Sequence, residues 1–169
     1  MDIETLSGVR HLELHVKEEK VESVTVDMGE VQISPVVSLP YNIEGRPISV
    51  GNPHVVILVD DMERVPLKEW GPVIEKHYLF PDGVNVEFVQ VLDKQSIRMR
   101  VWERGSGITM ACGTGACASA VAAIDSGYCN KNEAICVKLD GGDLTIVIDD
   151  DNNAKMTGPA VIVCECEVE

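Results

Sequence analysis

The chain has 169 residues, 45% of them hydrophobic, which is enough for one compact domain or two small ones. Acidic residues outnumber basic ones 28 to 14, and the formal net charge of −14 argues against nucleic acid or an anionic membrane as a partner. No apolar run approaches the roughly 20 residues of a membrane span. The first residues show no secretory leader, so we expect a cytoplasmic location.

Most of the chain has the pattern of β-strands. Apolar and polar residues alternate over 12–16 and 24–28, and the turn-like residues 18–20 between them predict a hairpin. Six more strands are expected: a buried one at 55–59, two hairpins at 84–92 with 97–102 and at 134–139 with 144–148, and a last strand at 160–168.

Two segments have helical character. The first, over 66–77, starts well with Pro66, but Gly71-Pro72 should break or kink it. The second, over 113–126, is rich in alanine and is followed by Gly127, which suits a C-terminal cap. Antiparallel hairpins together with two helices predict the α+β class.

Six cysteines are present, none of them in a Cys-x-x-Cys pair, and the four histidines lie far from them in sequence. We therefore expect no metal site and no disulfide scaffold. The acidic run 149–153 lacks a calcium-loop pattern and predicts a solvated turn. All cysteines except Cys112 are expected to be structural: Cys117, Cys129, Cys136, Cys164 and Cys166.

The segment 103–117 offers the most chemistry. A strand ends in Glu103-Arg104, a glycine-containing loop follows, and Cys112 stands at the start of a glycine-led helix. Unpaired N–H groups at a helix start bind anions, and the same positive end favours thiolate over thiol. Cys112 is thus a candidate acid/base or nucleophile beside a bound carboxylate or phosphate; the alternative is a small buried hydrophobe.

Several polar residues elsewhere allow two interpretations. Asn52 and His54 precede a buried strand, where they would hold a substrate or simply form an Asn-Pro turn. Asn85 opens a strand, where asparagine is disfavoured, so it either faces solvent or has a polar role. Glu103 and Arg104 fit a site or a solvated surface pair.

Four sequence blocks, in this order and spacing, closely resemble the diaminopimelate epimerase family, and the resemblance extends over nearly the whole chain. One Cys-Gly-Thr-Gly is weakly specific, whereas four ordered blocks are strongly specific. The blocks are Gly51-Asn52-Pro53-His54, Val84-Asn85-Val86-Glu87-Phe88, Glu103-Arg104-Gly105 and Ala111-Cys112-Gly113-Thr114-Gly115-Ala116-Cys117.

The resemblance implies a cofactor-independent epimerase that interconverts LL- and meso-diaminopimelate without pyridoxal phosphate or metal, in lysine and peptidoglycan precursor synthesis. Two cysteines would face opposite sides of the substrate α-carbon, one removing a proton as thiolate and the other delivering one as thiol. Because an α-proton is very weakly acidic, the developing carbanion needs electrostatic stabilisation in a closed, dry site.

The same resemblance assigns roles around the helix start. Cys112 looks like the second acid/base cysteine, and Gly113 and Thr114 look like donors to the α-carboxylate. His54 looks like the residue that tunes the opposing cysteine.

Four further residues take substrate-binding roles by resemblance. Arg104 looks like the clamp on the distal carboxylate, a task suited to a planar guanidinium. Glu103 looks like a polar partner near Cys112 and the substrate ammonium. Asn52 and Asn85 look like hydrogen-bonding residues of the pocket.

The sequence departs from the family in one respect, because its single Cys-Gly is Cys112-Gly113 and the family's other catalytic cysteine has no counterpart. We expect one lobe of the two-lobed fold, mostly antiparallel strands around a central helix, inactive alone. Residues 1–27 would border the missing N-terminal lobe, 28–158 would form the C-terminal lobe, and 159–169 would be a strand returning to the first lobe. The expected partners are diaminopimelate, the missing lobe and, through exposed strand edges, a second copy.

Two other functions remain open. The chain would be a non-catalytic, epimerase-like binding or assembly module, or another racemase or isomerase of the same fold that works without pyridoxal phosphate. Arg104 and Asn85 favour a diamino-dicarboxylate over a monocarboxylate, because a second carboxylate needs its own clamp.

Overall fold

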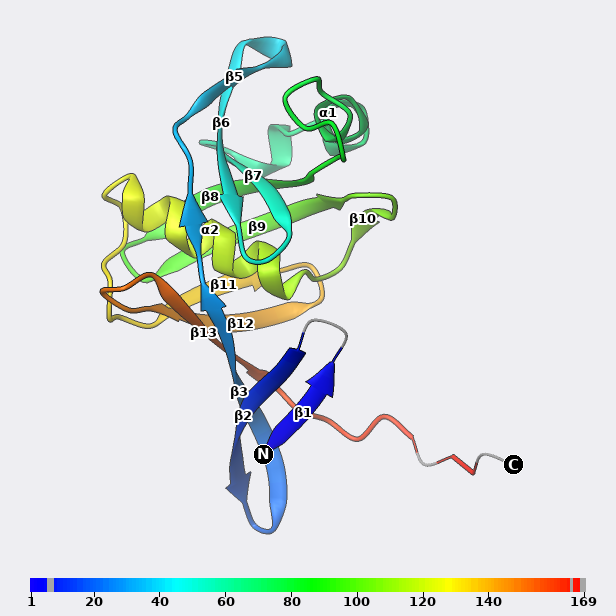
Figure 1. The fold of residues 1–169 in the computed structure, drawn as a ribbon, viewed down its shortest axis with the longest axis vertical. Helices are drawn as coiled ribbons and strands as arrows, with labels where there is room; N and C mark the ends of the chain where they lie inside the picture. The colour runs from blue at the N-terminus through cyan, green and yellow to red at the C-terminus, as the bar shows by residue number, and fades with distance from the viewer. Residues whose placement is uncertain (6–7, 165, 168–169) are drawn as a thin grey trace.

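A computed structural model describes residues 1–5, 8–164 and 166–167, in which a long curled sheet surrounds one helix (Figure 1). The helices are α1 (Leu67–Glu75) and α2 (Gly113–Asp125), with short 3-10 turns at Pro40–Asn42 and Met62–Arg64. The strands within these residues are β1 (Asp2–Thr5), β2 (Gly8–Lys17), β3 (Lys20–Glu30), β4 (Gln32–Ile33), β5 (Val37–Leu39), β6 (Ile43–Ser49), β7 (Pro53–Leu58), β8 (Asn85–Asp93), β9 (Ser96–Glu103), β10 (Gly107–Thr109), β11 (Ile135–Leu139), β12 (Gly142–Ile148) and β13 (Asn153–Pro159).

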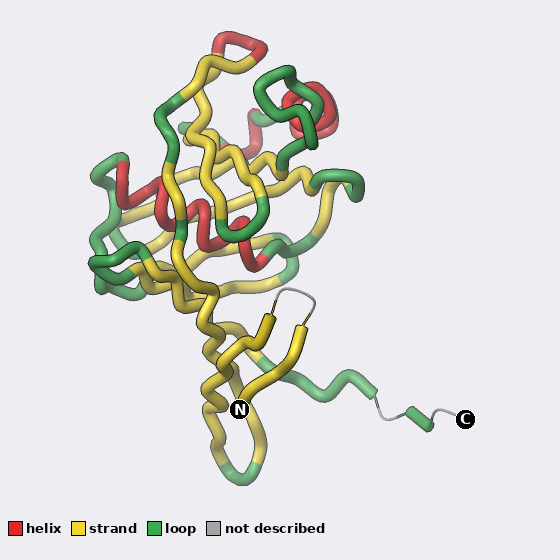
Figure 2. Tube along the Cα trace, viewed as in Figure 1, coloured by secondary structure: helices red, strands yellow, loops and turns green. Residues whose placement is uncertain are grey.

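The sheet is mostly antiparallel, as expected for the α+β class. Its strand order is β1-β2-β3-β13-β12-β11-β9-β8-β7-β6-β4, while β10 pairs with β9 and β5 with β6. Two pairs are parallel, β7 with β8 and β9 with β11. Strand predominance is plain in the secondary-structure colouring (Figure 2). The predicted fold class is therefore confirmed.

Helix α2 is central because its side chains are small. Every residue from 115 to 123 is buried, and the helix contacts strands from β6 to β13. A helix enclosed on all sides must be apolar all round, and alanine and glycine let the strands approach its backbone closely. The buried Ser119 hydroxyl donates to the Gly115 carbonyl at 2.7 Å, so it carries no unpaired proton. Gly127, with φ +78°, ends the helix as predicted.

A second core lies on the opposite face of β7 and β8, where Val55, Ile57, Val86 and Phe88 pack toward α1. The expected break in this helix is wrong, because α1 continues through Pro72. The preceding residue is a glycine, which has no Cβ to clash with the proline ring. Burial of Leu67 and Ile74 also holds the two ends of α1.

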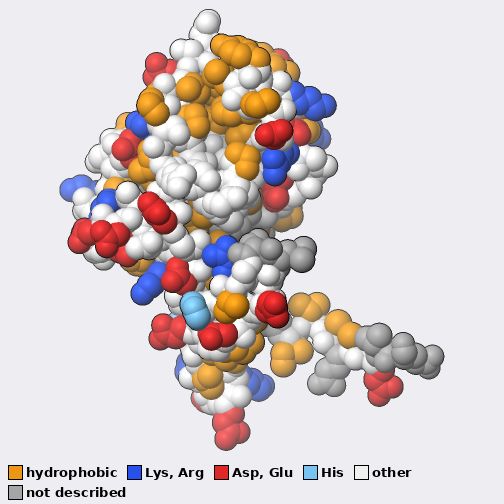
Figure 3. All heavy atoms as spheres, viewed as in Figure 1, with side chains coloured by type: hydrophobic (Ala, Val, Ile, Leu, Met, Phe, Trp, Pro, Cys, Tyr) orange, Lys and Arg blue, Asp and Glu red, His pale blue; other side chains and the backbone are white. Residues whose placement is uncertain are grey.

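The hairpin of β2 and β3 is confirmed, and with β1 it projects from the body of the molecule (Figure 1). Its turn places Glu18 and Glu19 at positive φ. Apolar side chains on these strands remain exposed, among them Val9 and Val16 (Figure 3). β3 runs without interruption across the boundary expected at residue 27, and the expected division of the chain stays a prediction.

The hairpins of β8 with β9 and of β11 with β12 and the buried strand β7 were all predicted. The last strand was not placed correctly: β13 ends at Pro159, and residues 160–164 and 166–167 form no strand, while 165 and 168 lie outside the described residues. The Ala160 N–H still donates to the Glu22 carbonyl of β3 at 3.0 Å, but no strand pairs with the described residues after it. Among the described strands, the sequence prediction missed β1, β4, β5, β6, β10 and β13.

Replacing Gly71 tests the packing of α1. A Cβ there would stand 2.6 Å from the Trp102 ring, so Gly71→Ala is expected to destabilise the fold by roughly 1–3 kcal/mol through overpacking. Helix propensity alone predicts the opposite sign, because alanine favours a helix by about 1 kcal/mol over glycine. Urea unfolding measures the difference. The exposed Lys68→Ala is the control, and an unfolding midpoint for Gly71→Ala at or above that of the unsubstituted chain would contradict the prediction.

Candidate active site

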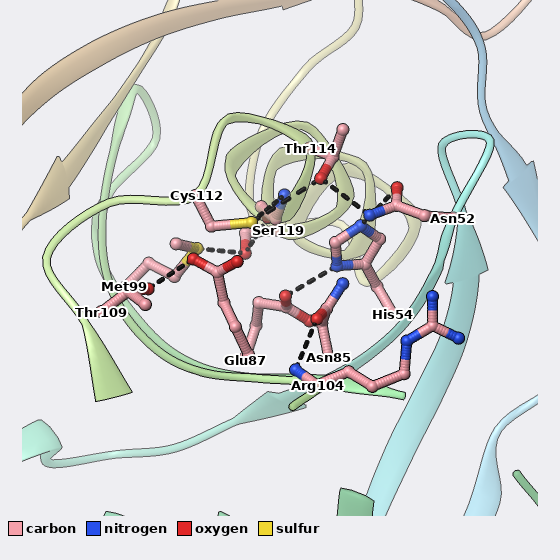
Figure 4. A network of polar contacts seen from close by, with 12 residues as sticks. Asn52, His54, Asn85, Glu87, Met99, Arg104, Thr109, Cys112, Thr114 and Ser119 are labelled. Carbon is pink, nitrogen blue, oxygen red and sulfur yellow. Dashed lines mark hydrogen bonds and ion pairs between the residues drawn. The ribbon is translucent and has the colours of Figure 1, made fainter. Parts of the chain in front are cut away.

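Polar side chains converge where α2 begins, at the starts of β7 and β8 (Figure 4). In the parallel pairing of these strands His54 lies opposite Asn85 and Val56 opposite Glu87. Residues two apart on a strand share a face, so His54, Asn85 and Glu87 all lie on the face toward α2. The apolar residues between them serve the core around α1.

A buried acid–imidazole pair forms the floor of the site. His54 Nδ1 lies 2.7 Å from Glu87 Oε1, and both side chains have 0% exposure. Burial raises the pKa of the Glu87 carboxyl, and the neighbouring His54 offsets part of that rise. Glu87 Oε2 has no hydrogen-bond partner among the described residues. A net negative charge on this buried pair, with one carboxylate oxygen unbonded, is costly. The pair therefore favours the states in which its net charge is zero.

Asn52 links this pair to the helix. His54 Nε2 lies 3.0 Å from Asn52 Oδ1, and Asn52 Nδ2 donates to Thr114 Oγ1 at 3.2 Å. Thr114 Oγ1 in turn lies 3.6 Å from Cys112 Sγ. The side chain of Asn52, predicted to meet substrate, thus uses both ends of its amide within the protein.

Cys112 is the residue that caps α2. Its Sγ accepts from the Gly115 N–H at 3.3 Å. Burial raises the pKa of the Cys112 thiol, the charges of Glu87 and Glu103 raise it further, and the contacts with Thr114 and Gly115 lower it. In the lobe as described, Cys112 is accordingly a thiol, the form that delivers a proton.

The first N–H groups of α2 are free to bind an anion. Within the described residues, the backbone N–H groups of Gly113 and Thr114 have no acceptor, as is usual for the first turn of a helix. Both residues are half-buried. The helix dipole adds positive potential at the same place, so a carboxylate beside Cys112 would be stabilised.

Arg104 and its neighbours complete one rim. The Arg104 backbone N–H donates to Asn85 Oδ1 at 2.8 Å, which fixes the chain as β9 ends. Arg104 Nη1 donates to the Asp82 carbonyl at 3.0 Å, and none of the ion pairs among the described residues involves its guanidinium. Glu103 accepts a hydrogen bond from Thr109 Oγ1. This rim therefore carries an exposed cation with no acidic partner.

Glu75, on α1, accepts hydrogen bonds from the residues on either side of Glu103 and Arg104. Glu75 accepts from Trp102 Nε1 at 2.7 Å and from the Gly105 N–H at 3.1 Å. These two bonds flank Glu103 and Arg104 in the chain. The loop that carries Arg104 is thereby fixed to the last residue of α1.

All eight predicted site residues gather around the start of α2. The sequence prediction missed Glu87, although the signal was present, since a lone carboxylate in an otherwise apolar buried strand needs a partner. It also missed Glu75, whose role depends on how α1 packs. Among the described residues no three His, Cys, Asp or Glu side chains are arranged to hold a metal ion. None of the described helices is long and apolar enough to cross a membrane.

The fold is that of racemases and epimerases. A crystal structure of a probable proline racemase from Agrobacterium radiobacter K84 superposes with a TM-score of 0.71, covering 94% of this chain and 56% of that one at 16% identity. At this identity the likeness concerns the fold alone.

Sequence comparison identifies the family to which the chain belongs. The family model for diaminopimelate epimerase matches residues 47–163. Diaminopimelate epimerases from Bacillus pumilus and Phocaeicola vulgatus are 46% and 48% identical over 96% and 99% of this chain. The chain belongs to the diaminopimelate epimerase family, as its sequence blocks predicted. It spans 63% and 65% of the length of these two relatives.

Thiol labelling tests the environments of the cysteines. Burial raises the pKa of Cys117 to about 12, so we expect no labelling of this residue in the folded chain at mildly alkaline pH. The exposed Cys164 and Cys166 should react first and Cys112 much more slowly. Iodoacetamide labelling followed by tandem mass spectrometry gives each rate, with a urea-unfolded sample as control. Labelling of Cys117 at the rate of the exposed thiols would refute this order.

Proposed function

We propose that this chain forms one side of the active site of a diaminopimelate epimerase, which interconverts LL- and meso-diaminopimelate by proton transfer at the α-carbon. The observation that carries this proposal is the Cys112 thiol at the N-terminus of α2, beside the free N–H groups of Gly113 and Thr114. The reaction would serve lysine and peptidoglycan precursor synthesis in the cytoplasm.

The helix start would bind the substrate α-carboxylate. Removing the α-proton spreads negative charge from the carbon into the adjoining carboxylate, so the N–H donors bind the carbanion more strongly than the substrate. Cys112 lies next to these donors and would reach one face of the same carbon. This electrostatic stabilisation would allow the reaction to proceed without pyridoxal phosphate or metal.

The rim would select a dicarboxylate. The Arg104 guanidinium is exposed and lacks an acidic partner, so a distal carboxylate would supply one in two-pronged geometry. Asn85 would set its position through the Arg104 backbone, and its own Nδ2 remains available to substrate. Glu103 would face the substrate ammonium. This arrangement supports diaminopimelate over the single carboxylate of proline.

Inversion at carbon needs an acid and a base on opposite faces, and the described site has one thiol at its centre. We infer that the second group comes from the remaining third of the family fold, and that this chain alone has no epimerase activity. His54 would then tune that group only indirectly, because its side chain is fully buried and its ring nitrogens face Glu87 and Asn52. Water would be excluded only when both sides close over the substrate.

Deuterium exchange tests the proposal. LL-diaminopimelate incubated in heavy water should gain α-deuterium when this chain is combined with the part of the Bacillus pumilus relative that it does not match. Neither protein alone should exchange. Cys112→Ser should abolish formation of deuterated meso-diaminopimelate in the pair, because a serine hydroxyl is a far weaker acid than a thiol. Inversion that survives Cys112→Ser would refute the role of Cys112.

Arg104 provides a second variant in the same assay. Arg104→Met keeps much of the side-chain length but removes the clamp, so we expect kcat/KM to fall by roughly a hundredfold or more, the loss of a charged hydrogen-bonded pair. Arg104→Lys, which keeps the charge but not the paired donors, should lie between. An unchanged kcat/KM in Arg104→Met would reject its assigned role.

We also propose that the exposed apolar side chains of the β1–β3 projection and of residues 161–163 form the surface that meets the rest of the family fold. These three residues are 79–90% exposed, an unusual state for valine and isoleucine. When the rest of the family fold is absent, a second copy of this chain would cover these apolar side chains. Sedimentation velocity should show a dimer at high concentration and none when Val161 and Val163 are replaced by serine. A monomer throughout would count against this surface.

A further inference from the structure

A continuous line of side-chain contacts joins the buried Glu87 to the Cys112 sulfur (Figure 4). Its steps are Glu87 Oε1 to His54 Nδ1 at 2.7 Å, His54 Nε2 to Asn52 Oδ1 at 3.0 Å, Asn52 Nδ2 to Thr114 Oγ1 at 3.2 Å and Thr114 Oγ1 to Cys112 Sγ at 3.6 Å. The resemblance to the family gives Glu87 no role.

From His54 onward, the donor of each hydrogen bond lies on the Glu87 side and the acceptor on the Cys112 side. Asn52 Oδ1 only accepts, so the proton in its bond with His54 must sit on Nε2. Asn52 Nδ2 only donates, so Thr114 Oγ1 accepts from it and keeps its own proton free. That proton is then available to Cys112 Sγ, where a donor stabilises thiolate over thiol.

This direction requires one shared proton in the buried pair. With a proton on Nε2, either His54 is an imidazolium beside the Glu87 carboxylate, or Glu87 is a carboxylic acid that donates to Nδ1. Both states carry the same total charge. The fully buried Glu87 with its bare Oε2 disfavours losing that proton.

Loss of the shared proton would reverse the direction of the hydrogen bonds between His54, Asn52 and Thr114. An ionised Glu87 beside a neutral imidazole holds the remaining proton on Nδ1, so Nε2 becomes an acceptor. The Asn52 amide must then turn over, presenting Nδ2 to His54 and Oδ1 to Thr114. The Thr114 hydroxyl would donate to Asn52, and the sulfur would lose its donor.

We propose that Glu87 is a positioning residue: by sharing a proton with His54 it sets the direction of the hydrogen bonds through Asn52, and so decides whether the Thr114 hydroxyl donates to Cys112. Glu87 does not touch substrate and moves no α-proton. The consequence for epimerisation rests on the proposed function, but the state of the thiol does not.

Other titratable groups face this cluster. Glu103 at the end of β9 acts on both Glu87 and Cys112, and Cys117 lies one turn further along α2. Each opposes the thiolate when ionised, and neither belongs to the line. The Arg46–Asp125 pair, at 2.6 Å, lies at the opposite end of α2. Among these groups, only Glu87 can therefore change whether the Thr114 hydroxyl donates a hydrogen bond to Cys112 Sγ.

The test measures the alkylation rate of Cys112 against pH in this chain, using iodoacetamide and tandem mass spectrometry. Thr114→Val removes the hydroxyl and should slow alkylation about tenfold, equal to one unit of thiol pKa. Thr114→Ser should restore the unsubstituted profile. Glu87→Gln mimics the protonated acid and cannot ionise, so it should match the unsubstituted chain at neutral pH and react faster under alkaline conditions.

A double substitution separates this role from simple charge removal. Deleting the Glu87 charge would speed alkylation through space whatever Thr114 is. If Glu87 also acts through the hydroxyl, the alkaline gain of Glu87→Gln is larger with Thr114 present than in the Thr114→Val background, where only the through-space part remains. An equal gain in the two backgrounds overturns the proposal, as does a Glu87→Gln profile identical to that of the unsubstituted chain at every pH.

Two controls keep the outcomes distinct. Circular dichroism and thermal melting show whether Glu87→Gln folds; if it does not, the Thr114→Val and Thr114→Ser pair still decides, and equal rates in both overturn the proposal. Because labelling needs no substrate, a failed deuterium exchange with the predicted labelling pattern would reject the proposed function alone. Exchange without that pattern would reject only the role of Glu87.

Discussion

The enclosure of α2 by a curled sheet is the constraint from which the site follows. Only a helix of small residues fits inside such a sheet, and all its side chains from 115 to 123 are consumed by packing. Polar chemistry is therefore confined to the helix start, where backbone N–H groups are unpaired and point outward. The strands beneath then supply the side chains that meet this end. Cys112, Gly113 and Thr114 are functional candidates because the rest of α2 is core.

The buried pair beneath the helix start shows how one polar group in a core imposes others. Glu87 enters the face toward α2 because its neighbours Val86 and Phe88 occupy the other face. A carboxyl there needs a partner, which His54 supplies from the adjoining parallel strand. His54 in turn needs an acceptor, which Asn52 provides. The polar chain ends at the Cys112 sulfur, at the start of α2.

Sequence reasoning predicted what depends on local pattern. Alternating residues gave the hairpins, alanine content and Gly127 gave α2, and the ordered blocks around Asn52 and Cys112 gave the site residues. It missed what depends on distant contacts. β6 contains Pro47, and proline is disfavoured within strands. Pro72 is tolerated because Gly71 precedes it and α1 packs closely on Trp102. The strand expected at 160–168 has apolar alternation, but strand structure also requires a neighbour.

Glu75 has a consequence for binding entropy. Its carboxylate holds both Trp102 and Gly105, so the two residues between them cannot move independently of α1. A guanidinium on a free loop would lose backbone freedom on meeting a carboxylate, and that loss would weaken binding. Here the backbone that carries Arg104 is ordered in advance by the two hydrogen bonds of Glu75. The position of this cation thus depends on the last residue of α1.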